Sequence, residues 1–151
     1  MLSNRGGRSR RGFAARFRSI VTSEWEDFEL VAVDDGSVDS TPAMLAGWAA
    51  RDRRIRIVTL DHPHGVAAAR NRGLAVARGT IVAPHDADAV FVPARLGPQV
   101  AALRADPGTA LVCGGAEFID ARGRRLFTRV LRQPPEVIAH VLPFGNPLIH
   151  G

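Results

Sequence analysis

Short apolar runs alternate along this chain with segments in which apolar residues recur every three or four positions. The runs predict buried strands at 28–33, 55–60, 80–83 and 109–113. The spaced segments predict helices at 13–22, 41–52, 65–77 and 93–105. Because helices and strands alternate, we expect right-handed βαβ units. The predicted fold class is α/β, with a mostly parallel twisted sheet and helices on both faces.

The C-terminal part of the chain departs from this alternation. Apolar residues at 116–119 and 126–130 flank the sequence DARGRR, which predicts a turn and therefore an antiparallel hairpin. A final short helix is expected over 133–141, where two prolines lie near its start.

Basic residues are concentrated at the beginning of the chain. The formal net charge is +5, but six of the 20 basic residues precede the first acidic residue, Glu24. The other 14 are set against 15 acidic residues, so the rest of the chain carries a charge of −1. We expect residues 1–12 to be a disordered Arg/Gly/Ser-rich tail and residues 13–151 to form one domain. A tail that binds nucleic acid or anionic lipid is the alternative, and we expect no nucleic-acid partner.

The cysteine content and the hydropathy restrict the cellular setting. A single cysteine, Cys113, excludes an internal disulfide and predicts a small thiol in an apolar strand. No apolar run approaches the roughly 18–20 residues that cross a bilayer. The N-terminal arginines are followed by no apolar stretch of the kind a secretory signal needs. We therefore expect a reducing, cytoplasmic location.

Two adjacent carboxylates follow the first predicted strand. Asp34 and Asp35 end the apolar run of FELVAVDDGSVD, and a turn and a helix start come next. Ligands of open α/β sheets bind outside the carboxyl ends of the strands. Two acids placed there repel each other, so we expect a polar ligand or a cation beside them. The alternative is structural: Asp35 opens the turn and Asp39 caps the helix.

A second acidic motif lies about fifty residues later, at the end of the third predicted strand. Asp86 and Asp88 are two residues apart and point the same way in an extended chain. Such a pair suits Mg²⁺ or Mn²⁺, which binds a few carboxylates together with water and phosphate oxygens. A solvated pair of surface acids is the alternative. If the sheet is parallel, both acidic motifs lie at the same edge.

Between the acidic motifs stands the sequence GVAAARNRG, which predicts a helix that begins with a glycine. Gly65 lets a backbone approach closely, and the free N–H groups of a helix start attract an anion. Arg70 is a candidate for neutralising a diphosphate, with a structural salt bridge to Asp34 or Asp86 as the alternative.

Three histidines, His62, His64 and His85, lie at predicted strand ends. They suggest zinc, yet no Cys/His spacing supports a zinc site. We interpret them as polar loop residues, with His85 the nearest of the three to a ligand.

Taken in order, the motifs DDGSVDST, GVAAARNRGLAVARG and DAD resemble the nucleotide-sugar-binding half of a family 2 glycosyltransferase of the GT-A (nucleotide-diphospho-sugar transferase) fold. The resemblance extends from about residue 13 to 119, over two thirds of the chain. It implies transfer of a sugar from a nucleoside-diphosphate sugar, most often a UDP-sugar, to an acceptor hydroxyl in cell-wall or polysaccharide biosynthesis. It also implies inversion at the sugar and dependence on Mg²⁺ or Mn²⁺.

The resemblance assigns roles to individual residues. Asp35 would contact the nucleobase with Asp34 supporting it, and Arg70 and Gly65 would lie near the nucleotide. Asp86 and Asp88 would form the metal-binding DxD motif, with Asp88 as the direct ligand. The metal would bridge the two phosphates and stabilise the leaving diphosphate.

Several features depart from the family pattern. The family's first strand has no counterpart in SNRGGRSRRG, Ala89 stands where a second consecutive aspartate is common, and Thr80 replaces a usual aspartate. No acid after Asp88 has the context of the family's catalytic base. We therefore expect an incomplete domain that lacks the first strand and the acceptor half. We also expect a marginal monomer or a homodimer that repairs the sheet, with peripheral membrane association as a further expectation.

Two other classes of protein remain as alternatives. A non-catalytic nucleotide-binding or scaffold module would keep the same fold without turnover. A dinucleotide-binding Rossmann domain is disfavoured, because no G-x-G-x-x-G follows a predicted strand.

Overall fold

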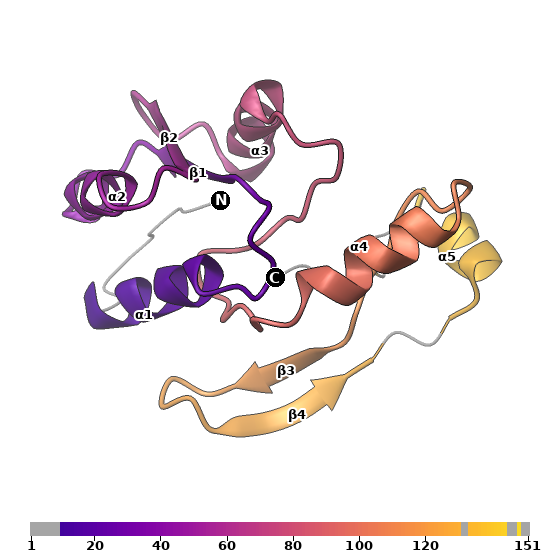
Figure 1. Ribbon diagram of the computed structural model, residues 1–151. Helices are drawn as coiled ribbons and strands as arrows, with labels where there is room; N and C mark the ends of the chain where they lie inside the picture. The colour runs from indigo at the N-terminus through magenta and orange to yellow at the C-terminus, as the bar shows by residue number, and fades with distance from the viewer. Residues whose placement is uncertain (1–9, 131–132, 145–147, 149–151) are drawn as a thin grey trace. The chain divides into compact units, whose positions relative to one another are not determined.

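The computed structural model describes residues 10–130, 133–144 and 148. The chain divides into two compact units, 1–97 and 98–151, which are described separately (Figure 1). Helix α1 (Arg10–Val21) begins inside the segment expected to be a tail, and residues 1–9 lie outside the described residues.

A parallel pair of strands forms the centre of the first unit. Strand β1 (Leu30–Asp35) pairs with β2 (Ile55–Leu60) in a continuous register from Leu30 opposite Ile55 to Asp35 opposite Leu60. Helix α2 (Thr41–Ala49) connects them, so the predicted βαβ unit is confirmed. Because the strands are parallel and in register, their carboxyl ends lie at the same edge.

Helices cover both faces of this pair, and the alternation of side chains along β1 explains how (Figure 1). Ala32 is buried in a cluster with side chains of α1 and α2, which therefore cover its face. Val31 and Val33 point the other way. A Cβ built on Gly73 of helix α3 (Val66–Val76) would lie 3.1 Å from Val33 and 3.9 Å from Val31.

The core of the first unit is built from both aromatic and aliphatic residues. Phe17 of α1 stacks on Phe13, with ring centroids 5.9 Å apart, and meets Trp48 of α2 at 5.4 Å. Leu45 is completely buried between these rings and the strands. The non-local packing of α1 on α2 is therefore mainly apolar, which is the dominant source of stability in a small unit.

The second unit contains two further helices and a hairpin. Helix α4 (Leu96–Ala105) crosses the boundary between the units, and α5 (Pro135–Val141) follows the hairpin. Strands β3 (Ala116–Ile119) and β4 (Arg125–Arg129) pair in the antiparallel sense, as the sequence predicts, and their stacked rings of Phe118 and Phe127 lie 4.5 Å apart.

The predictions of strands at 80–83 and 109–113 are wrong. Both segments are described, and neither pairs with another strand. The first is only four residues long and ends at Pro84, which has no N–H to donate to a ladder. The second runs into Gly114 and Gly115, which weaken a strand. Each paired sheet in the described chain therefore has two strands, and the parallel sheet is narrower than predicted.

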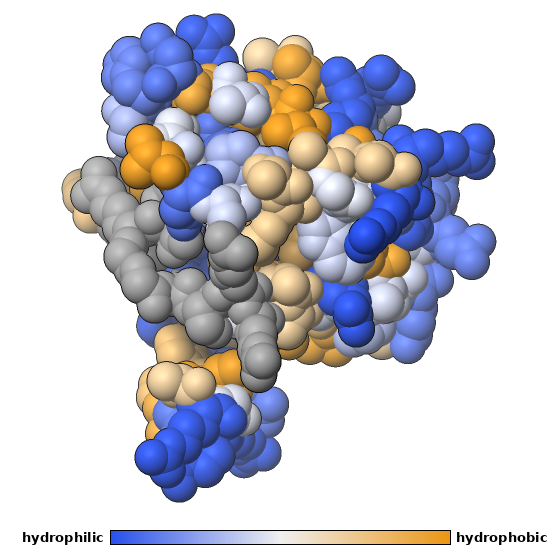
Figure 2. Space-filling view, turned by 90° about the vertical axis from the view of Figure 1, so that its left-hand side faces the viewer, coloured by the Kyte–Doolittle hydropathy of each residue, from blue (hydrophilic) through white to orange (hydrophobic). Residues whose placement is uncertain are grey.

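Large apolar side chains are exposed in both units, among them Val38 and the hairpin residues Leu126 and Phe127. Figure 2 shows one face of the molecule, on which hydrophobic residues form separate areas between hydrophilic ones. Among the described residues, no helix has the length and apolar character needed to cross a membrane.

The loops at the carboxyl edge of the parallel pair lie in close contact. Gly36, directly after β1, has a φ of +69°. A Cβ at this position would lie 2.5 Å from the backbone carbon of His62, which follows β2. Glycine is therefore required at position 36 for two reasons, the backbone conformation and the close approach of the second loop.

Arg54 joins three segments at the opposite edge. Its guanidinium binds Asp52 at 2.7 Å and the carbonyl of Val21 at 3.0 Å, and it lies 4.4 Å from the centre of the Phe28 ring. The hydrogen bond from Arg54 is the largest of the effects that lower the pKa of Asp52. Arg54 thus ties the end of α1 to the starts of β1 and β2.

We predict opposite effects for two glycine substitutions. Gly36→Ala combines a left-handed backbone with overlap against His62, and should lower the free energy of unfolding by about 2–4 kcal/mol. Gly47→Ala lies in α2 with open space around its Cβ, and should raise that free energy by about 0.5–1 kcal/mol. Urea unfolding measures both; equal effects would contradict the contact between the loops.

We predict that Arg54→Met lowers the free energy of unfolding by about 1–2 kcal/mol, whereas Arg53→Met at the exposed neighbouring position changes little. The Asp52 pKa is lowered in the fold, so its contribution is complete above the ordinary value of about 3.9 and is lost at lower pH. The difference between wild type and Arg54→Met should therefore narrow as the pH falls below about 4. A difference that widened in acid would refute this assignment.

Candidate functional site

The first acidic motif is placed at the carboxyl edge of the parallel pair. Asp34 and Asp35 are the last residues of β1, and the alternation of the strand directs them to opposite faces. Asp35 lies on the side of α3 and Asp34 on the side of Ala32. Both side chains are buried, which is unusual for carboxylates and calls for partners.

Asp35 binds the loop that leads into α3. Its Oδ1 accepts a hydrogen bond from the backbone N–H of His64 at 2.7 Å, and its Oδ2 accepts one from Gly65 at 2.9 Å. The carboxylate therefore occupies the start of the helix, where N–H groups lack partners within the helix. It holds in place the segment at which an anionic ligand would be expected.

Asp34 has one satisfied and one unsatisfied oxygen. Its Oδ1 accepts a hydrogen bond from the N–H of Ser37 at 3.1 Å, so Asp34 and not Asp35 organises the turn. Its Oδ2 is buried and has no hydrogen-bond partner among the described residues. A buried oxygen without a partner is costly, and its presence in a fold indicates a ligand, an ion or water.

Asp39 supports the start of α2, although the N-cap residue is Ser40, whose side chain makes no capping hydrogen bond. Its Oδ1 accepts a hydrogen bond from the N–H of Thr41, the first residue of α2, at 2.8 Å.

Gly65 precedes α3 with a φ of +89°, a conformation that favours glycine even though a Cβ would meet no neighbour there. The helix that follows is rich in small residues, and Ala69 is completely buried. Small side chains allow α3 to lie close to β1. This close packing places the first turn of α3 beside Asp35.

Arg70 connects α3 with the second acidic motif. Its guanidinium binds Oδ1 of Asp86 at 2.9 Å, and both side chains are about one-third exposed at 35%. The salt bridge to Asp86 that the sequence left as an alternative is thus present. Arg70 is five residues from Gly65, or about 7–8 Å along the helix axis. Both acidic motifs are therefore attached to the first half of α3.

The segment around Asp86 and Asp88 is fixed from several sides. Ala87 packs against the apolar core, and the N–H of Phe91 donates to Oγ of Ser19 in α1 at 2.9 Å. His85 meets the Phe91 ring edge-on at 5.5 Å. Asp88 is exposed. Residues 86–89 form a turn, in which the N–H of Ala89 donates to the carbonyl of Asp86 at 3.0 Å, so the expectation of an extended chain with both carboxylates on one side is wrong.

Asp86 and Asp88 supply carboxylate oxygens, the ligand type of a hard divalent cation. Oxygen ligands are what Mg²⁺ and Mn²⁺ prefer, and a partly exposed pair leaves room for water and phosphate oxygens. Arg70 engages one oxygen of Asp86, which is compatible with a cation at the other. These residues could therefore hold the metal that the sequence predicts.

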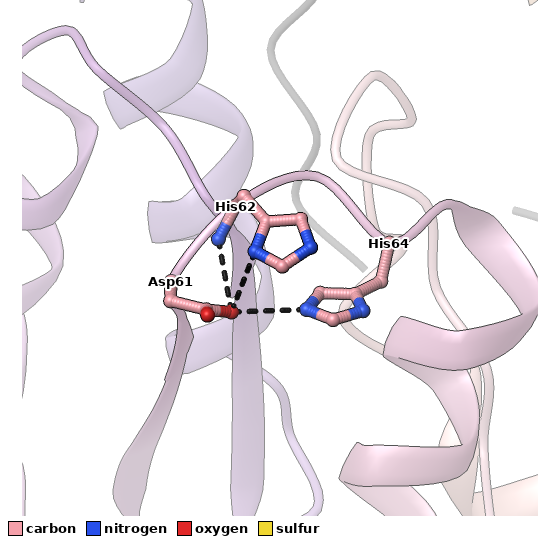
Figure 3. A group of neighbouring side chains, drawn as sticks. All are labelled: Asp61, His62 and His64. Atoms are coloured by element: carbon pink, nitrogen blue, oxygen red, sulfur yellow. Dashed lines mark hydrogen bonds and ion pairs between the residues drawn. The ribbon is translucent and has the colours of Figure 1, made fainter.

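A group of side chains that the sequence interpretation set aside comes together after β2. Asp61, His62 and His64 place their ligand atoms within 4.8 Å of one another (Figure 3). Hydrogen bonds from His64, the larger effect, and from His62 lower the pKa of Asp61 to about 2. The sequence feature that could have predicted this group is the D-H-P-H spacing, since a turn there brings two alternate histidines to one carboxylate.

An open depression lies at the other edge of the parallel pair, where β1 and β2 begin. It is lined by Val21, Ser23 and residues 26–28 and 52–54, which include the Arg54–Asp52 ion pair. Ligands of open α/β sheets bind at the carboxyl ends of the strands, so the chemistry is better placed at the other edge.

Comparison with known proteins adds independent evidence. The family model described as Glycosyl transferase family 2 matches residues 11–149. The chain is 37% identical over 109 residues to the succinoglycan biosynthesis protein ExoO of Rhizobium meliloti. These residues make up 72% of this chain and 30% of that protein. It is 31% identical over 142 residues to the putative glycosyltransferase EpsE of Bacillus subtilis. These residues make up 93% of this chain and 50% of that protein.

A third relative has a more specific name. The UDP-Glc:alpha-D-GlcNAc-diphosphoundecaprenol beta-1,3-glucosyltransferase WfgD of Escherichia coli is 29% identical over 90 residues, 60% of this chain and 35% of that protein. The chain thus spans about a third to a half of the length of these relatives. The match to the family model covers nearly the whole chain and includes both acidic motifs and α3. The chain belongs to glycosyl transferase family 2, and its fold is the GT-A fold of that family.

Proposed function

We propose that this chain binds a nucleoside-diphosphate sugar in a metal-dependent manner and that the protein transfers the sugar to an acceptor hydroxyl with inversion. The observation that carries the proposal is the attachment of both acidic motifs to α3. Asp35 binds the N–H of Gly65 at its start, and Arg70 on its second turn binds Asp86. One rigid helix therefore relates the two motifs to each other.

The proposed roles follow from this arrangement and from the family. Asp35 contacts the nucleobase and Asp34 supports it from the other face of β1, where its unpartnered Oδ2 favours a polar group. Gly65 has no side chain, so the nucleotide can approach the backbone closely at the start of α3. Arg70 holds Asp86 in position and contributes positive charge beside the diphosphate.

We assign the divalent metal to Asp88 and Asp86. When bound, the ion neutralises the charge of the leaving diphosphate. Asp88, which is exposed, offers the direct carboxylate ligand, and Asp86 is oriented by its ion pair with Arg70. The preorganised orientation of Asp86 reduces the cost of assembling the site when the donor substrate binds.

We propose the acceptor step for the whole protein, which includes more than the residues described. In an inverting transfer, a general base removes the proton of the acceptor hydroxyl while the oxygen attacks the anomeric carbon. We assign no such base among the described residues. The names of the relatives support polysaccharide biosynthesis as the process and a UDP-sugar as the donor substrate. We also propose that the protein acts in the cytoplasm at the inner face of the membrane and that it forms a homodimer.

We predict that the chain binds UDP and UDP-sugars more tightly when Mn²⁺ is present. Asp88→Asn should weaken the Mn²⁺-dependent part about 10-fold or more, because it removes a metal ligand. Glu24→Gln removes the same charge at an exposed position and should change nothing. Isothermal titration calorimetry measures both variants.

The same titration separates the alternatives. Binding that is unaffected by Mn²⁺ or by Asp88→Asn would contradict the proposal. Binding of donor substrate without any transfer or hydrolysis would instead support the non-catalytic nucleotide-binding module.

We predict a second effect at α3. Arg70→Met should weaken Mn²⁺-dependent UDP binding about 10- to 100-fold, since it removes a charged hydrogen bond at the site. Arg72→Met, an exposed position on the same helix, should bind as the wild type does. Thermal unfolding serves as the control for folding. Equal affinities of the two variants would show that Arg70 has no part in the site.

A further inference from the structure

The loop between β2 and α3 brings together one carboxylate and two imidazoles (Figure 3). Oδ1 of Asp61 lies 3.0 Å from Nδ1 of His62 and 3.0 Å from Nε2 of His64. The two rings are near each other, with centroids 4.1 Å apart. Both ring nitrogens thus lie against the same carboxylate oxygen, and the three residues bring potential ligand atoms within 4.8 Å of one another.

These separations are close to those of a metal site. Zinc binds nitrogen and oxygen at about 2.0–2.2 Å, so neighbouring ligand atoms of a tetrahedral site lie about 3.3 Å apart. The observed 3.0 Å between Asp61 and each histidine differs little from this value. All three residues are exposed, so small rotations of the side chains can complete the geometry without disturbing the core.

The backbone that carries these ligands is held before any ion arrives. The N–H of His64 donates to buried Asp35 at 2.7 Å, and the N–H of His62 donates to Asp61 at 3.1 Å. Gly36 lies directly against the backbone of His62 and Pro63, where a Cβ would come within 2.5–2.7 Å. Pro63 fixes its own φ. Such preorganisation reduces the entropy lost when a metal binds.

We propose that Asp61, His62 and His64 form a binding site for a zinc-type divalent ion, separate from the carboxylate pair Asp86 and Asp88. Two imidazole nitrogens with one carboxylate oxygen favour Zn²⁺, Co²⁺, Ni²⁺ or Cu²⁺ over Mg²⁺, which prefers oxygen alone. Three protein ligands leave at least one position for water.

The hydrogen bonds of the Asp61 carboxylate show which contacts a bound ion would replace. In the metal-free loop this carboxylate accepts hydrogen bonds from both imidazoles. An ion would replace these two hydrogen bonds: each imidazole would bind it through the nitrogen that faces Asp61 and carry its proton on the other ring nitrogen.

A metal bound at this site would also affect the neighbouring carboxylate of Asp35. His64 contributes its side chain to the proposed metal and its backbone N–H to Asp35. An ion at this point therefore stiffens the loop that Asp35 holds at the start of α3. The site acts as a clamp on the loop and requires no direct contact with a substrate.

The test uses the full 151-residue chain without an affinity tag and titrates it with Zn²⁺ against a chromophoric chelator. We expect one bound ion per chain. His62→Ala/His64→Ala should weaken Zn²⁺ binding at least ~10–100-fold, because even loss of an outer partner of a metal ligand has an effect of that size. His140→Ala, an exposed histidine of the second unit, is the matched control and should bind as the wild type does.

Two further measurements keep the test decisive. NMR of the wild type follows the five histidine rings during the titration, and the resonances of His62 and His64 should move first. Asp86→Asn/Asp88→Asn should retain Zn²⁺ binding, which separates this site from the proposed substrate metal. Unchanged affinity in the double histidine variant, or loss of binding only in the double aspartate variant, would overturn the proposal.

Discussion

The carboxylate of Asp35 is the interaction on which the arrangement of the first unit's functional edge depends. It ends β1 and accepts hydrogen bonds from two consecutive backbone N–H groups, those of His64 and Gly65. A strand, a loop and a helix start are thereby joined by one buried side chain. Burial of this charge is tolerable because both oxygens are satisfied. Without it, the helix start and the loop after β2 would lose the two hydrogen bonds that tie them to the end of β1.

From this point the structure extends in two directions. Along α3, Arg70 reaches Asp86 and so brings the second acidic motif to the same helix. Along the loop, His64 is fixed beside Asp61 and His62. The edge of the parallel pair carries the mixed nitrogen and oxygen group, and α3 links this edge to Asp86 of the oxygen pair; we propose a different cation preference for each group. The proposed roles of the two groups differ accordingly.

The sequence predicted those parts of the fold in which local pattern and tertiary packing agree. The runs that became β1 and β2 are apolar and end at acids, and the DARGRR turn lies between two strands that do pair. The segment at 80–83 has the same apolar character but no partner. Strand formation depends on a neighbour as well as on composition, so its failure could not be read from the local pattern.

The candidate site was predictable in its residue types and less so in its contacts. The positions of Asp34 and Asp35 follow from the end of an apolar run, and the salt bridge of Arg70 with Asp86 was one of two that the sequence left open. The hydrogen bonds from His64 and Gly65 to Asp35 could not be foreseen, since they depend on how the loop after β2 folds back. The same is true of the group of Asp61, His62 and His64, which a turn at Pro63 assembles.

We propose that both acidic motifs surround one metal-bound diphosphate, and paramagnetic broadening by Mn²⁺ can establish whether they do. The measurement compares amide NMR spectra of the chain with Mn²⁺ before and after addition of UDP, in the His62→Ala/His64→Ala background so that the loop histidines cannot bind the ion. We expect UDP to cause joint broadening of the amides of Asp35, Gly65 and residues 86–88. Broadening confined to residues 86–88, with Asp35 and Gly65 unaffected by UDP, would contradict it.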